Sequence, residues 1–488
     1  MTMPMPSPEH DSAQDVAVRL RAGYDPHSSI AAQSKRFFEL WLADAEFRAS
    51  LEDGRALARK GEIDVDPEDL KFIWNDRYRQ GHDDADISDI VAKASPALRA
   101  LFSWIQYNHH YRDRMRLEST PVQPSFAAWR ARQIARCATS FRAAYHHNTP
   151  HVGYALELTA GCTVGCWFCG VSAPKLDGIF AATEGNLQFF EDVLTVIGDI
   201  VGPPALGHGF LYWATDPFDH PDYELFARRF QSMSGQFPLT TTAIPLRNPA
   251  RTRSFLALAQ GSGAEKVRFS ASTLRQVHAL HAEFTAQDLA IVDIIPLNKG
   301  SLLQPSASGR ARERLQNRAP VIPLSDQVVD VSRDQTISCV SGFLINLVTQ
   351  SVKLISPCNS SDRWPLGYFV YEERRFSNTA DLERIMAGMI ERHMPEALPV
   401  DRPVAFRSDL QFKPRSGGFT LAGPHAAVDI TCSALAVDVA EAVARGDATP
   451  AAIASDFAAS YPLPADMALD WMRSWFDAGL VSEEPNEP

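Results

Sequence analysis

Three cysteines carry the most distinctive chemistry that this sequence offers. Cys162, Cys166 and Cys169 lie in the stretch "ELTAGCTVGCWFCGVSAPKL", while the whole chain of 488 residues has seven cysteines. In a reducing compartment, a tight group of thiols indicates a metal-binding or catalytic loop rather than a disulfide. Three thiolates at C-x3-C-x2-C spacing can bind three irons of a [4Fe–4S] cluster, which takes four ligands in all.

The missing fourth ligand is the informative feature of this loop. It leaves one iron open to an external chelator, and the amino acid end of S-adenosylmethionine (SAM) supplies both an amine and a carboxylate. An electron from the cluster can then split the sulfonium and give a 5′-deoxyadenosyl radical. The alternative is a zinc site, which usually closes with four ligands in two paired groups. The sequence has no second C-x2-C pair, and nothing in the spacing selects His151 or His208 as the fourth ligand.

The elements around the loop predict how it is positioned. "HVGYALELTA" is typical of a strand that enters the loop. Helix and strand patterns then alternate from "NLQFFEDVLTVIGDIV" and "GHGFLYWAT" to "LAIVDIIPL", and "CVSGFLINLVTQSVKLISPC" predicts a hairpin. This alternation predicts βα units and a parallel sheet, here a partial, TIM-like (β/α)6 barrel over residues 151–375. In such sheets the chemistry lies at the carboxyl ends of the strands, where we expect the cysteine loop.

The remaining segments are expected to form modules around this barrel. The predicted fold class is α/β, with an N-terminal helical domain in which Asp66 before Pro67 and Ser95 before Pro96 each predict a helix start. The polar segment "NKGSLLQPSASGRARERLQNRAP" is either a loop that orders over substrate or a linker. The predicted order is a flexible leader (1–28), the helical domain (29–150), the barrel (151–375), a helix and linker (376–415) and a winged-helix module (416–488).

The strand, the cysteine loop and the βα units resemble the radical SAM superfamily over about residues 150–375. In that superfamily a glycine-rich turn after the second strand contacts SAM through its backbone, and "YWATDP" takes that place here without the glycines. The resemblance makes Thr215 and Asp216 candidates, with Asp216 as a direct acceptor from the SAM ammonium. For residues at the ends of later strands, the alternative is a side chain that faces solvent or caps a helix. Five further residues complete the predicted cofactor-binding set. They are the strand-end residues Thr242, Arg268, Ser270 and Ser272, and Phe168, the aromatic residue before the last cysteine.

The four remaining cysteines bear on the reaction. Cys137 and Cys432 are expected in hydrophobic cores, while Cys339 and Cys358 flank the predicted hairpin. A thiol S–H bond is weak enough to give a hydrogen atom to a carbon radical. If Cys358 faces the adenosyl carbon across the substrate, the radical removes the Cα hydrogen of an L-residue and Cys358 returns one on the opposite face, which gives a D-residue. The alternative is a buried free thiol that behaves as a small hydrophobic side chain.

Three segments support this hypothesis through a second resemblance. "ELTAGCTVGCWFCGVSA", "YWATDPFDHPDYE" and "SPCNSSDRWPLGY" together resemble the radical SAM epimerases that mature ribosomally made, proteusin-type peptides. The resemblance implies an isomerase, irreversible L-to-D conversion within a precursor peptide, consumption of SAM at each event, and a cysteine hydrogen donor. We place that donor at Cys358, with Cys339 as the competing position. The rival enzyme is a radical SAM enzyme that crosslinks or methylates peptides, and the rival from another class is a non-catalytic peptide-binding scaffold whose cysteines hold zinc.

Composition and charge set the expected partners. The chain has 45% hydrophobic and 22% charged residues and a formal net charge of -12, which argues against a general nucleic-acid binder. No apolar run approaches the ~18–20 residues that span a bilayer, and the start has no secretion signal pattern, so we expect a cytoplasmic protein with no membrane partner. The block over 416–481 resembles winged-helix elements that bind a leader peptide as an added strand, with a structural or dimerising role as the alternative. The expected partners are the precursor peptide and an electron donor such as flavodoxin or ferredoxin.

Overall fold

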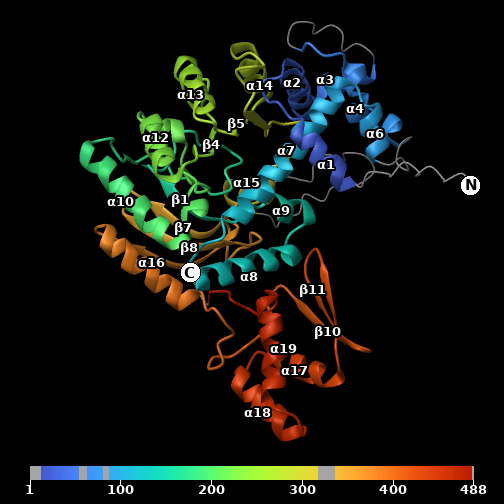
Figure 1. The fold of residues 1–488 in the computed structure, drawn as a ribbon, viewed down its shortest axis with the longest axis vertical. Coiled ribbons are helices and arrows are strands. Elements are labelled where there is room, and N and C mark those ends of the chain that lie inside the picture. The colour runs from blue at the N-terminus through green and yellow to red at the C-terminus, as the bar shows by residue number, and fades with distance from the viewer. Residues whose placement is uncertain (1–12, 54–62, 81–86, 317–335, 486–488) are drawn as a thin grey trace, which may run out of the picture. The chain divides into compact units, whose positions relative to one another are not determined.

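The computed structural model describes residues 13–53, 63–80, 87–316 and 336–485 (Figure 1). These residues divide into two compact units. The first unit joins the chain up to Arg114 to Leu239–Pro305. The second unit joins Met115–Pro238 to the chain from Ser306 onward. Residues 1–12 of the predicted leader lie outside the described part of the chain, and the chain from Ala13 begins with a helix.

The first unit builds a small parallel sheet with helices packed against it. Its strands pair in the order β4-β5-β6, and the register places Arg268 of β5 beside Asp293 of β6. Helix α2 packs against β6, where the carboxylate of Glu39 accepts from the backbone N–H of Ile294 (3.2 Å). The elements are α1 (Ala13–Ala22), α2 (Ser29–Ala43), α3 (Ala45–Glu52), the 3-10 helix η2 (Pro67–Leu70), α4 (Lys71–Trp74), α5 (Asp76–Gln80), α6 (Ile87–Lys93), α7 (Pro96–Glu118, which continues into the second unit), β4 (Thr240–Thr242), α13 (Pro249–Gly261), β5 (Val267–Ala271), α14 (Leu274–Glu283) and β6 (Val292–Pro296).

Both predicted helix starts in the first unit are confirmed. The side chain of Asp66 accepts a backbone N–H bond (3.0 Å) where η2 begins at Pro67. The hydroxyl of Ser95 accepts another (3.0 Å) where α7 begins at Pro96. A proline needs no N–H at the first helical position, and the oxygen before it satisfies one of the unpaired donors that follow.

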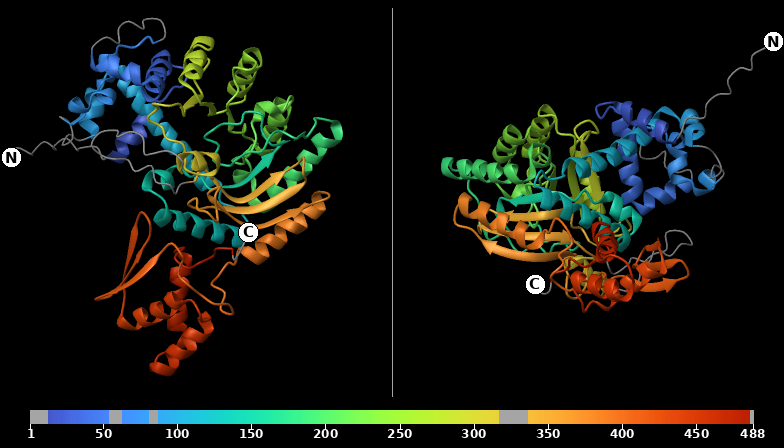
Figure 2. Two further views of the ribbon diagram at one scale, coloured as in Figure 1. Left: turned by 180° about the vertical axis from the view of Figure 1, so that it is seen from behind. Right: turned by 60° about the horizontal axis from the view of Figure 1, so that its bottom comes forward.

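The core of the second unit is a four-stranded mixed sheet. Its order is β1-β7-β8-β9, in which β1 and β7 run parallel and the later strands continue antiparallel. Helices α8 and α16 pack against this sheet, as Figure 2 shows. The elements are α8 (Pro124–Ser140), α9 (Ala143–Asn148), β1 (Val152–Glu157), β2 (Thr159–Ala160), β3 (Gly178–Ile179), α10 (Glu184–Val201), α11 (Pro203–Leu206), the 3-10 helix η3 (Pro217–Asp219), α12 (Tyr223–Ser234), α15 (Gly309–Gln316), β7 (Val340–Asn346), β8 (Ser351–Pro357), β9 (Tyr368–Arg375) and α16 (Thr379–His393).

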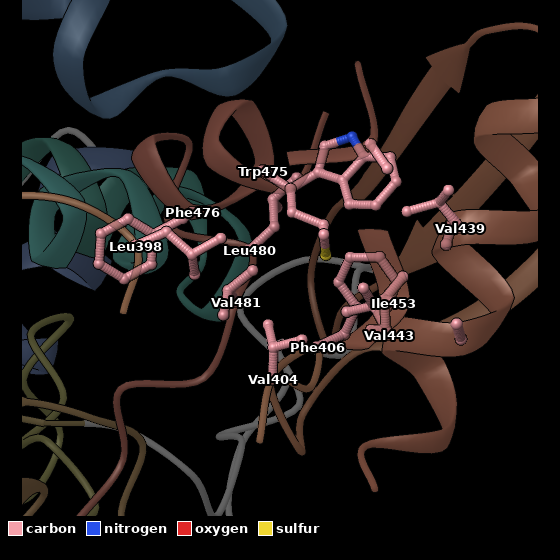
Figure 3. Close-up of a cluster of buried hydrophobic side chains, with 14 of the residues drawn as sticks. Leu398, Val404, Phe406, Val439, Val443, Ile453, Trp475, Phe476, Leu480 and Val481 are labelled. Carbon is pink, nitrogen blue, oxygen red and sulfur yellow. The ribbon is translucent and has the colours of Figure 1, made fainter. Parts of the chain in front are cut away.

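The last part of the second unit, from Leu398 onward, is here called the C-terminal module. It has a hydrophobic core of its own (Figure 3). The ring of Phe419 lies 5.9 Å from that of Phe406 and 5.4 Å from that of Trp475, centroid to centroid. Two of its helices begin where the side chains of Ser433 and Thr449 accept backbone N–H bonds, as their sequence positions favour. The elements are an antiparallel sheet followed by three helices: β10 (Gln411–Arg415), β11 (Gly418–Ala422), β12 (Ala427–Thr431), α17 (Ala434–Arg445), α18 (Pro450–Ser460) and α19 (Ala465–Asp477).

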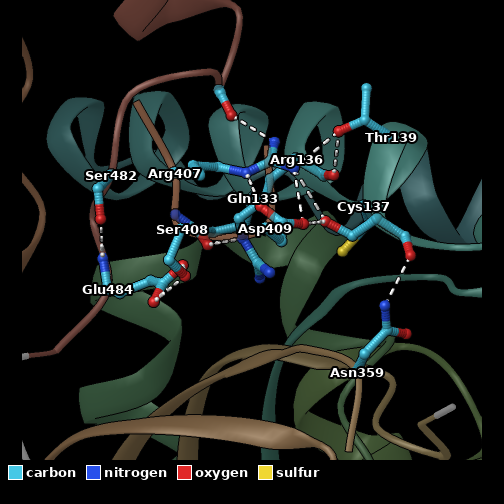
Figure 4. A network of polar contacts seen from close by, with 12 residues as sticks. Gln133, Arg136, Cys137, Thr139, Asn359, Arg407, Ser408, Asp409, Ser482 and Glu484 are labelled. Atoms are coloured by element: carbon cyan, nitrogen blue, oxygen red, sulfur yellow. Dashed lines mark hydrogen bonds and ion pairs between the residues drawn. The ribbon is translucent and has the colours of Figure 1, made fainter. Parts of the chain in front are cut away.

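Buried charged contacts fix the C-terminal module to helix α8 (Figure 4). The guanidinium of Arg407 donates to the hydroxyls of Thr139 (2.9 Å) and Ser140 (3.0 Å). Earlier on α8, Arg132 forms an ion pair with Glu483 (2.7 Å) in which both side chains are buried. Helix α8 therefore contacts both the four-stranded sheet and the module, so the module is not held by its linker alone.

One predicted strand is wrong. Residues 207–215 form no strand, and Phe210 makes a single isolated parallel bridge to Ala155 of β1. The ring of Tyr154 occupies the space that a second strand would need: its hydroxyl donates to the Leu206 carbonyl (2.6 Å), and a Cβ on Gly209 would lie 2.0 Å from the ring. The backbone of this segment therefore packs against a side chain instead of continuing a ladder with β1.

The α/β class is confirmed, whereas the strands do not close into one barrel. The predicted strands around β1, β4, β5 and β6 and the hairpin β7–β8 are present. Within the described residues, however, they form separate sheets in the two units. Two strands were not predicted: β9, which ends in the charged run "EERR", and β10, which contains a proline. Both features weaken a strand pattern. None of the described helices is both long and apolar enough to cross a lipid bilayer.

Candidate functional site

The end of β1 is fixed by a carboxylate that has lost most of its contact with water. Glu157, the last residue of β1, accepts from the backbone N–H of Ala214 (2.7 Å) and from Nδ2 of Asn346 (3.0 Å). Burial raises the pKa of Glu157, because the charged form loses solvation. These bonds tie the end of β7 and the segment that begins at Ala214 to the point where the cysteine loop starts.

Backbone N–H groups point at two of the three sulfurs in the cysteine loop. The N–H of Val164 lies 3.4 Å from Sγ of Cys162, and the N–H of Ala173 lies 3.3 Å from Sγ of Cys169. All three thiols, including that of Cys166, are partly exposed. Hydrogen bonds to sulfur are among the features that set the properties of protein-bound iron–sulfur clusters.

The loop closes on itself through its glycines. The N–H of Cys162 donates to the carbonyl of Pro174 (2.9 Å), which brings the two ends of the loop together. Gly161 has a φ of 85°, and a Cβ at this position would lie 2.3 Å from the carbonyl oxygen of Lys175. Only glycine fits this close approach, so the loop's shape depends on residue types that the sequence places beside the cysteines.

Two of the loop's thiols lie in an environment that keeps them protonated in the absence of a metal. Burial raises the pKa of Cys162 to about 11 and that of Cys166 to about 12, and the carboxylate of Asp216 adds to both shifts. A bound metal must displace these protons, and its positive charge then compensates for the lost solvation and the nearby carboxylate.

The donor set can be tested against the cofactor that the sequence predicts. In the part of the chain that the structure describes, no three His, Cys, Asp or Glu side chains are close enough to hold one metal ion. The three thiols do interact, because Cys162 and Cys169 both raise the pKa of Cys166. A [4Fe–4S] cluster takes each thiolate on a different iron, so its ligands need not converge on one point. Three partly exposed thiols on one loop, two of them facing N–H donors, fit such a cluster.

The two histidines considered for a zinc site are held by other elements. Nδ1 of His151 forms a hydrogen bond with the hydroxyl of Ser341 (2.8 Å) at the start of β1. Nε2 of His208 lies 2.7 Å from the carboxylate of Glu118. The loop's donor set is therefore completed by neither histidine in this structure.

The segment after Ala214 brings two carboxylates to the cysteine loop. Asp219 accepts from the backbone N–H of Thr163 (2.7 Å) and from its hydroxyl, which joins the segment to the loop. Asp216 is buried and accepts from the N–H of Phe218 (3.0 Å) at the start of η3, with Thr215 partly buried before it. The structure thus places the predicted Thr215 and Asp216 next to the loop. It adds Asp219, which was not predicted. The signal was the segment "DPFD", in which a second aspartate follows Asp216 after one 3-10 turn.

Phe168 supports the loop from within. It is buried and packs edge-on against the ring of Trp167, with 5.6 Å between the centroids. A contact of Phe168 with a cofactor stays a prediction.

The four strand-end candidates lie in the first unit, and they do not share one face of its sheet. Along β5, Arg268 and Ser270 alternate with buried residues and so lie on the less buried face. Thr242 pairs with Phe269 on the buried face, 1% exposed. Arg268 has Asp293 as its register partner on β6, a polar residue that the analysis missed inside "LAIVDIIPL". The two-residue period of β5 puts Arg268 and Ser270 on one face of the sheet and Phe269, the partner of Thr242, on the other.

Ser272 serves a helix start. Its hydroxyl and its backbone N–H both lie 2.8 Å from Oε1 of Gln276, whose own helix α14 is capped by Thr273 in a capping box. This is the capping alternative named for such residues. Ser270, by contrast, lines a small cavity of about 140 Å³ at the ends of β4 and β5.

Cys358 is buried in an aromatic pocket directly after β8. It is 4% exposed and packs with Trp364 and Phe369. The guanidinium of Arg136 donates to the carbonyl of Pro357 and lies 4.8 Å over the ring of Phe369. Burial raises the pKa of Cys358 well above its usual range, so its sulfur keeps the hydrogen at neutral pH.

The surroundings of Cys358 connect to the cysteine loop through helix α15. Strand β8 runs antiparallel to β7, so Cys358, which follows β8, lies beside the start of β7. The cysteine loop follows β1, which runs parallel to β7, so the loop begins at the other end of these strands. The N–H of Gly309 donates to the carbonyl of Pro365 (2.8 Å), in the loop after Cys358, and the N–H of Arg310 donates to the backbone carbonyl of Cys169 (3.0 Å). The two thiol regions thus share one neighbouring segment.

Cys339, the competing donor, lies just before β7. Its Sγ contacts the carbonyl of Ile337 (3.5 Å), and its own carbonyl accepts from the N–H of Val152 (2.9 Å). The side chain of Ile337 lies close against Gly170, where an added Cβ would be 2.5 Å away. Cys339 is partly exposed, so the structure leaves both cysteines as candidates.

Comparison with known proteins places the chain in a family. No family model matches it. It is 32% identical over 393 residues to the uncharacterized protein y4wI of Sinorhizobium fredii (strain NBRC 101917 / NGR234), with 78% of this chain and 73% of that protein covered. The chain therefore belongs to the same family as y4wI. Among solved structures, BtrN in complex with AdoMet and 2-DOIA aligns at a TM-score of 0.28 and 14% identity, over 41% of this chain and 72% of BtrN. At that TM-score the likeness supports no assignment of fold or function.

Proposed function

We propose that the protein is a radical SAM isomerase that converts L- to D-residues in a ribosomally made precursor peptide. The observation that carries the proposal is the cysteine loop. Three thiols at C-x3-C-x2-C spacing follow β1, and backbone N–H groups face two of the sulfurs. Such a donor set leaves the fourth ligand position of a [4Fe–4S] cluster open for SAM. The resemblance of three sequence segments to radical SAM peptide epimerases supports the finer assignment.

The chain's own residues would hold the two cofactors. When bound, the cluster and SAM supply a 5′-deoxyadenosyl radical that removes a hydrogen atom from a substrate carbon. Cys162, Cys166 and Cys169 would bind the irons, and Asp216 is the acceptor proposed for the SAM amino group. Within the first unit, Thr242 and Ser272 have local roles in a turn and at a helix start, whereas a cofactor-binding role of Arg268 and Ser270 stays a proposal.

Cys358 is the proposed hydrogen donor. Burial keeps its S–H protonated, so the sulfur carries the hydrogen that the substrate radical takes. After donation the sulfur radical recovers one electron from an external reductant and one proton from solvent. A flavodoxin or ferredoxin is therefore a proposed partner both for this step and for SAM cleavage.

The C-terminal module is the proposed leader-peptide site. In its sheet, β12 is an edge strand whose Val428 and Ile430 pack against the module's core while Ala427, Asp429 and Thr431 are exposed. An edge strand can pair with an added peptide strand through main-chain hydrogen bonds. The opposite edge strand, β10, contains Pro414, which has no N–H to donate. Strand β12 is therefore the edge at which we expect the leader peptide to pair.

The test is anaerobic reconstitution followed by turnover in D2O. We expect a brown protein with about four irons and four sulfides per chain, and 5′-deoxyadenosine on reduction. Co-expression in D2O with peptides encoded beside the gene should give one deuterium at Cα of each D-residue. A crosslinking enzyme would remove hydrogens without adding deuterium, and a methylating enzyme would add a methyl mass. Zinc without iron and sulfide in anaerobically prepared protein would refute the proposal.

A further inference from the structure

Arg310, near the start of α15, makes three hydrogen bonds to the cysteine loop. Its Nη1 donates to the carbonyl of Cys166 (3.1 Å), and its Nη2 donates to the carbonyl of Ala173. Its backbone N–H donates to the carbonyl of Cys169 (3.0 Å). One side chain therefore spans the part of the loop that contains its last two cysteines.

The residues just before Arg310 also approach the loop too closely for any side chain to intervene. Gly309 has a φ of 52°, and a Cβ there would lie 2.7 Å from the carbonyl oxygen of Cys169 and 2.6 Å from that of Gly170. A Cβ on Gly170 would in turn lie 2.7 Å from the hydroxyl of Ser308. Residues 308–310 and 169–170 are thus in direct backbone contact.

The same segment is anchored on its other side. The N–H of Gly309 donates to Pro365 (2.8 Å), and the hydroxyl of Ser360 donates to the carbonyl of Ala307. Arg310 is therefore attached to a supported segment rather than to a free loop. A guanidinium held in this way can fix the carbonyls that it reaches, because its planar donors allow few orientations.

We propose that Arg310 is a positioning residue that holds the cysteine loop in its metal-accepting shape before the metal arrives. This inference rests on the proposed function in one respect, that the loop binds an iron–sulfur cluster. A loop of eight residues with three thiols samples many shapes when it is free, and each fixed carbonyl reduces that freedom. Loss of Arg310 frees the carbonyls of Cys166 and Ala173 together, so the thiols no longer start from a common arrangement. Assembly of the cluster then becomes slower and less complete.

The first experiment uses full-length, metal-free protein kept reduced and anaerobic. Hydrogen–deuterium exchange is compared in wild type, R310A, R310K and R314A, the last being an exposed arginine on the same helix that matches the charge change. We expect the amides of residues 164–173 to exchange about tenfold faster in R310A, as the loss of charge-assisted hydrogen bonds implies. R314A should match wild type, and R310K should lie between them, because lysine keeps the charge but not the fork. Unchanged exchange in R310A would overturn the proposal.

The second experiment follows iron and sulfide uptake and the electron paramagnetic resonance signal of the reduced cluster in the same four proteins. We expect R310A to bind several-fold less cluster at equal time, with R314A at the wild-type level. Equal uptake by R310A and wild type would overturn the positioning role even if exchange had increased. Failure of wild type itself to bind iron would refute the proposed function, while the exchange experiment would still decide whether Arg310 orders the loop. If R310A does not fold, R310K is compared with R314A in both the exchange experiment and the uptake experiment.

Discussion

The two thiol regions of the second unit differ in what surrounds the sulfur. The cysteine loop presents partly exposed thiols to backbone N–H donors and lies beside Asp216 and Asp219. Cys358 instead lies in an aromatic pocket beside Arg136, almost without exposure. A loop of the first kind suits sulfurs that exchange a proton for a metal. A pocket of the second kind suits a sulfur that must keep its hydrogen until a carbon radical takes it.

Position along the chain does not define the role of a cysteine. Burial raises the pKa of the thiol at both Cys162 and Cys358. The consequence differs, because a metal can reach the loop and replace its protons, whereas aromatic rings pack against Cys358.

The largest effect should follow from removing any one cysteine of the loop. C162A, C166A and C169A are each expected to lose the cluster and all 5′-deoxyadenosine formation, because the remaining two thiolates cannot hold a cluster that also needs an open iron. Iron and sulfide analysis and chromatography of the reduced reaction measure both losses. C432A, in the C-terminal module, is the matched control and should retain both. Full SAM cleavage by C166A would contradict the ligand assignment.

Removal of the proposed donor should separate the two halves of the reaction. C358A is expected to cleave SAM at a rate near that of wild type and to form no D-residues, because the substrate radical finds no hydrogen on the second face. Chiral amino acid analysis of the peptide, together with 5′-deoxyadenosine counts, measures the separation. C339A is the matched variant for the competing position. Normal D-residue yield in C358A with loss in C339A would move the donor to Cys339.

A smaller effect should follow from loosening the pocket around Cys358. R136M keeps much of the side-chain volume but removes the hydrogen bonds to Pro357 and to the Ser356 hydroxyl (2.7 Å). We expect it to destabilise the protein by about 2–4 kcal/mol, because buried acceptors lose a charged donor. We also expect fewer D-residues per SAM cleaved. Urea unfolding and product ratios measure the two effects.

The control for R136M is one helical turn away on α8. R132M removes a buried arginine that pairs with Glu483 and stacks 4.0 Å over Phe476 in the C-terminal module. It should lose a comparable amount of stability while the number of D-residues per SAM cleaved stays at the wild-type value. A fall in that ratio in R132M equal to the fall in R136M would show a general loss of stability rather than a local effect on Cys358.

Local sequence patterns predicted most of the elements and failed where a tertiary contact decided the outcome. The alternation of apolar residues was enough for β5 and β6 and for the hairpin β7–β8. The apolar segment around Phe210 has the same composition as a strand, yet the ring of Tyr154 occupies the space beside Gly209. No pattern within 207–215 reveals that ring. The division of the strands into separate sheets likewise depends on contacts between distant parts of the chain.

The candidate site was predictable only where spacing along the chain is itself the signal. The three loop cysteines lie within eight residues, and the turn with Thr215 and Asp216 was selected by its position along the chain. The structure places this turn beside the loop. Arg310 could not be found in this way, because its contacts to the loop join residues more than 130 positions apart. In sequence it lies in a basic, aperiodic stretch typical of a linker. Cys137, expected in a core, is fully buried in α8.

The smallest predicted effect is a difference in thiol labelling that tests the contrast without any substrate. Alkylation needs a thiolate, and folding raises the pKa of Cys358, so at pH 8 the folded protein should label Cys358 at least about tenfold more slowly than the urea-unfolded chain. The sign follows from the shift: labelling of the unfolded chain increases as pH passes the ordinary thiol range, whereas the folded protein responds only at higher pH. Mass spectrometry of metal-free, reduced protein measures this, with the partly exposed Cys432 as the internal reference. Labelling of folded Cys358 as fast as Cys432 would mean that water reaches its sulfur freely, and a sulfur so placed could not be the shielded donor that the aromatic pocket implies.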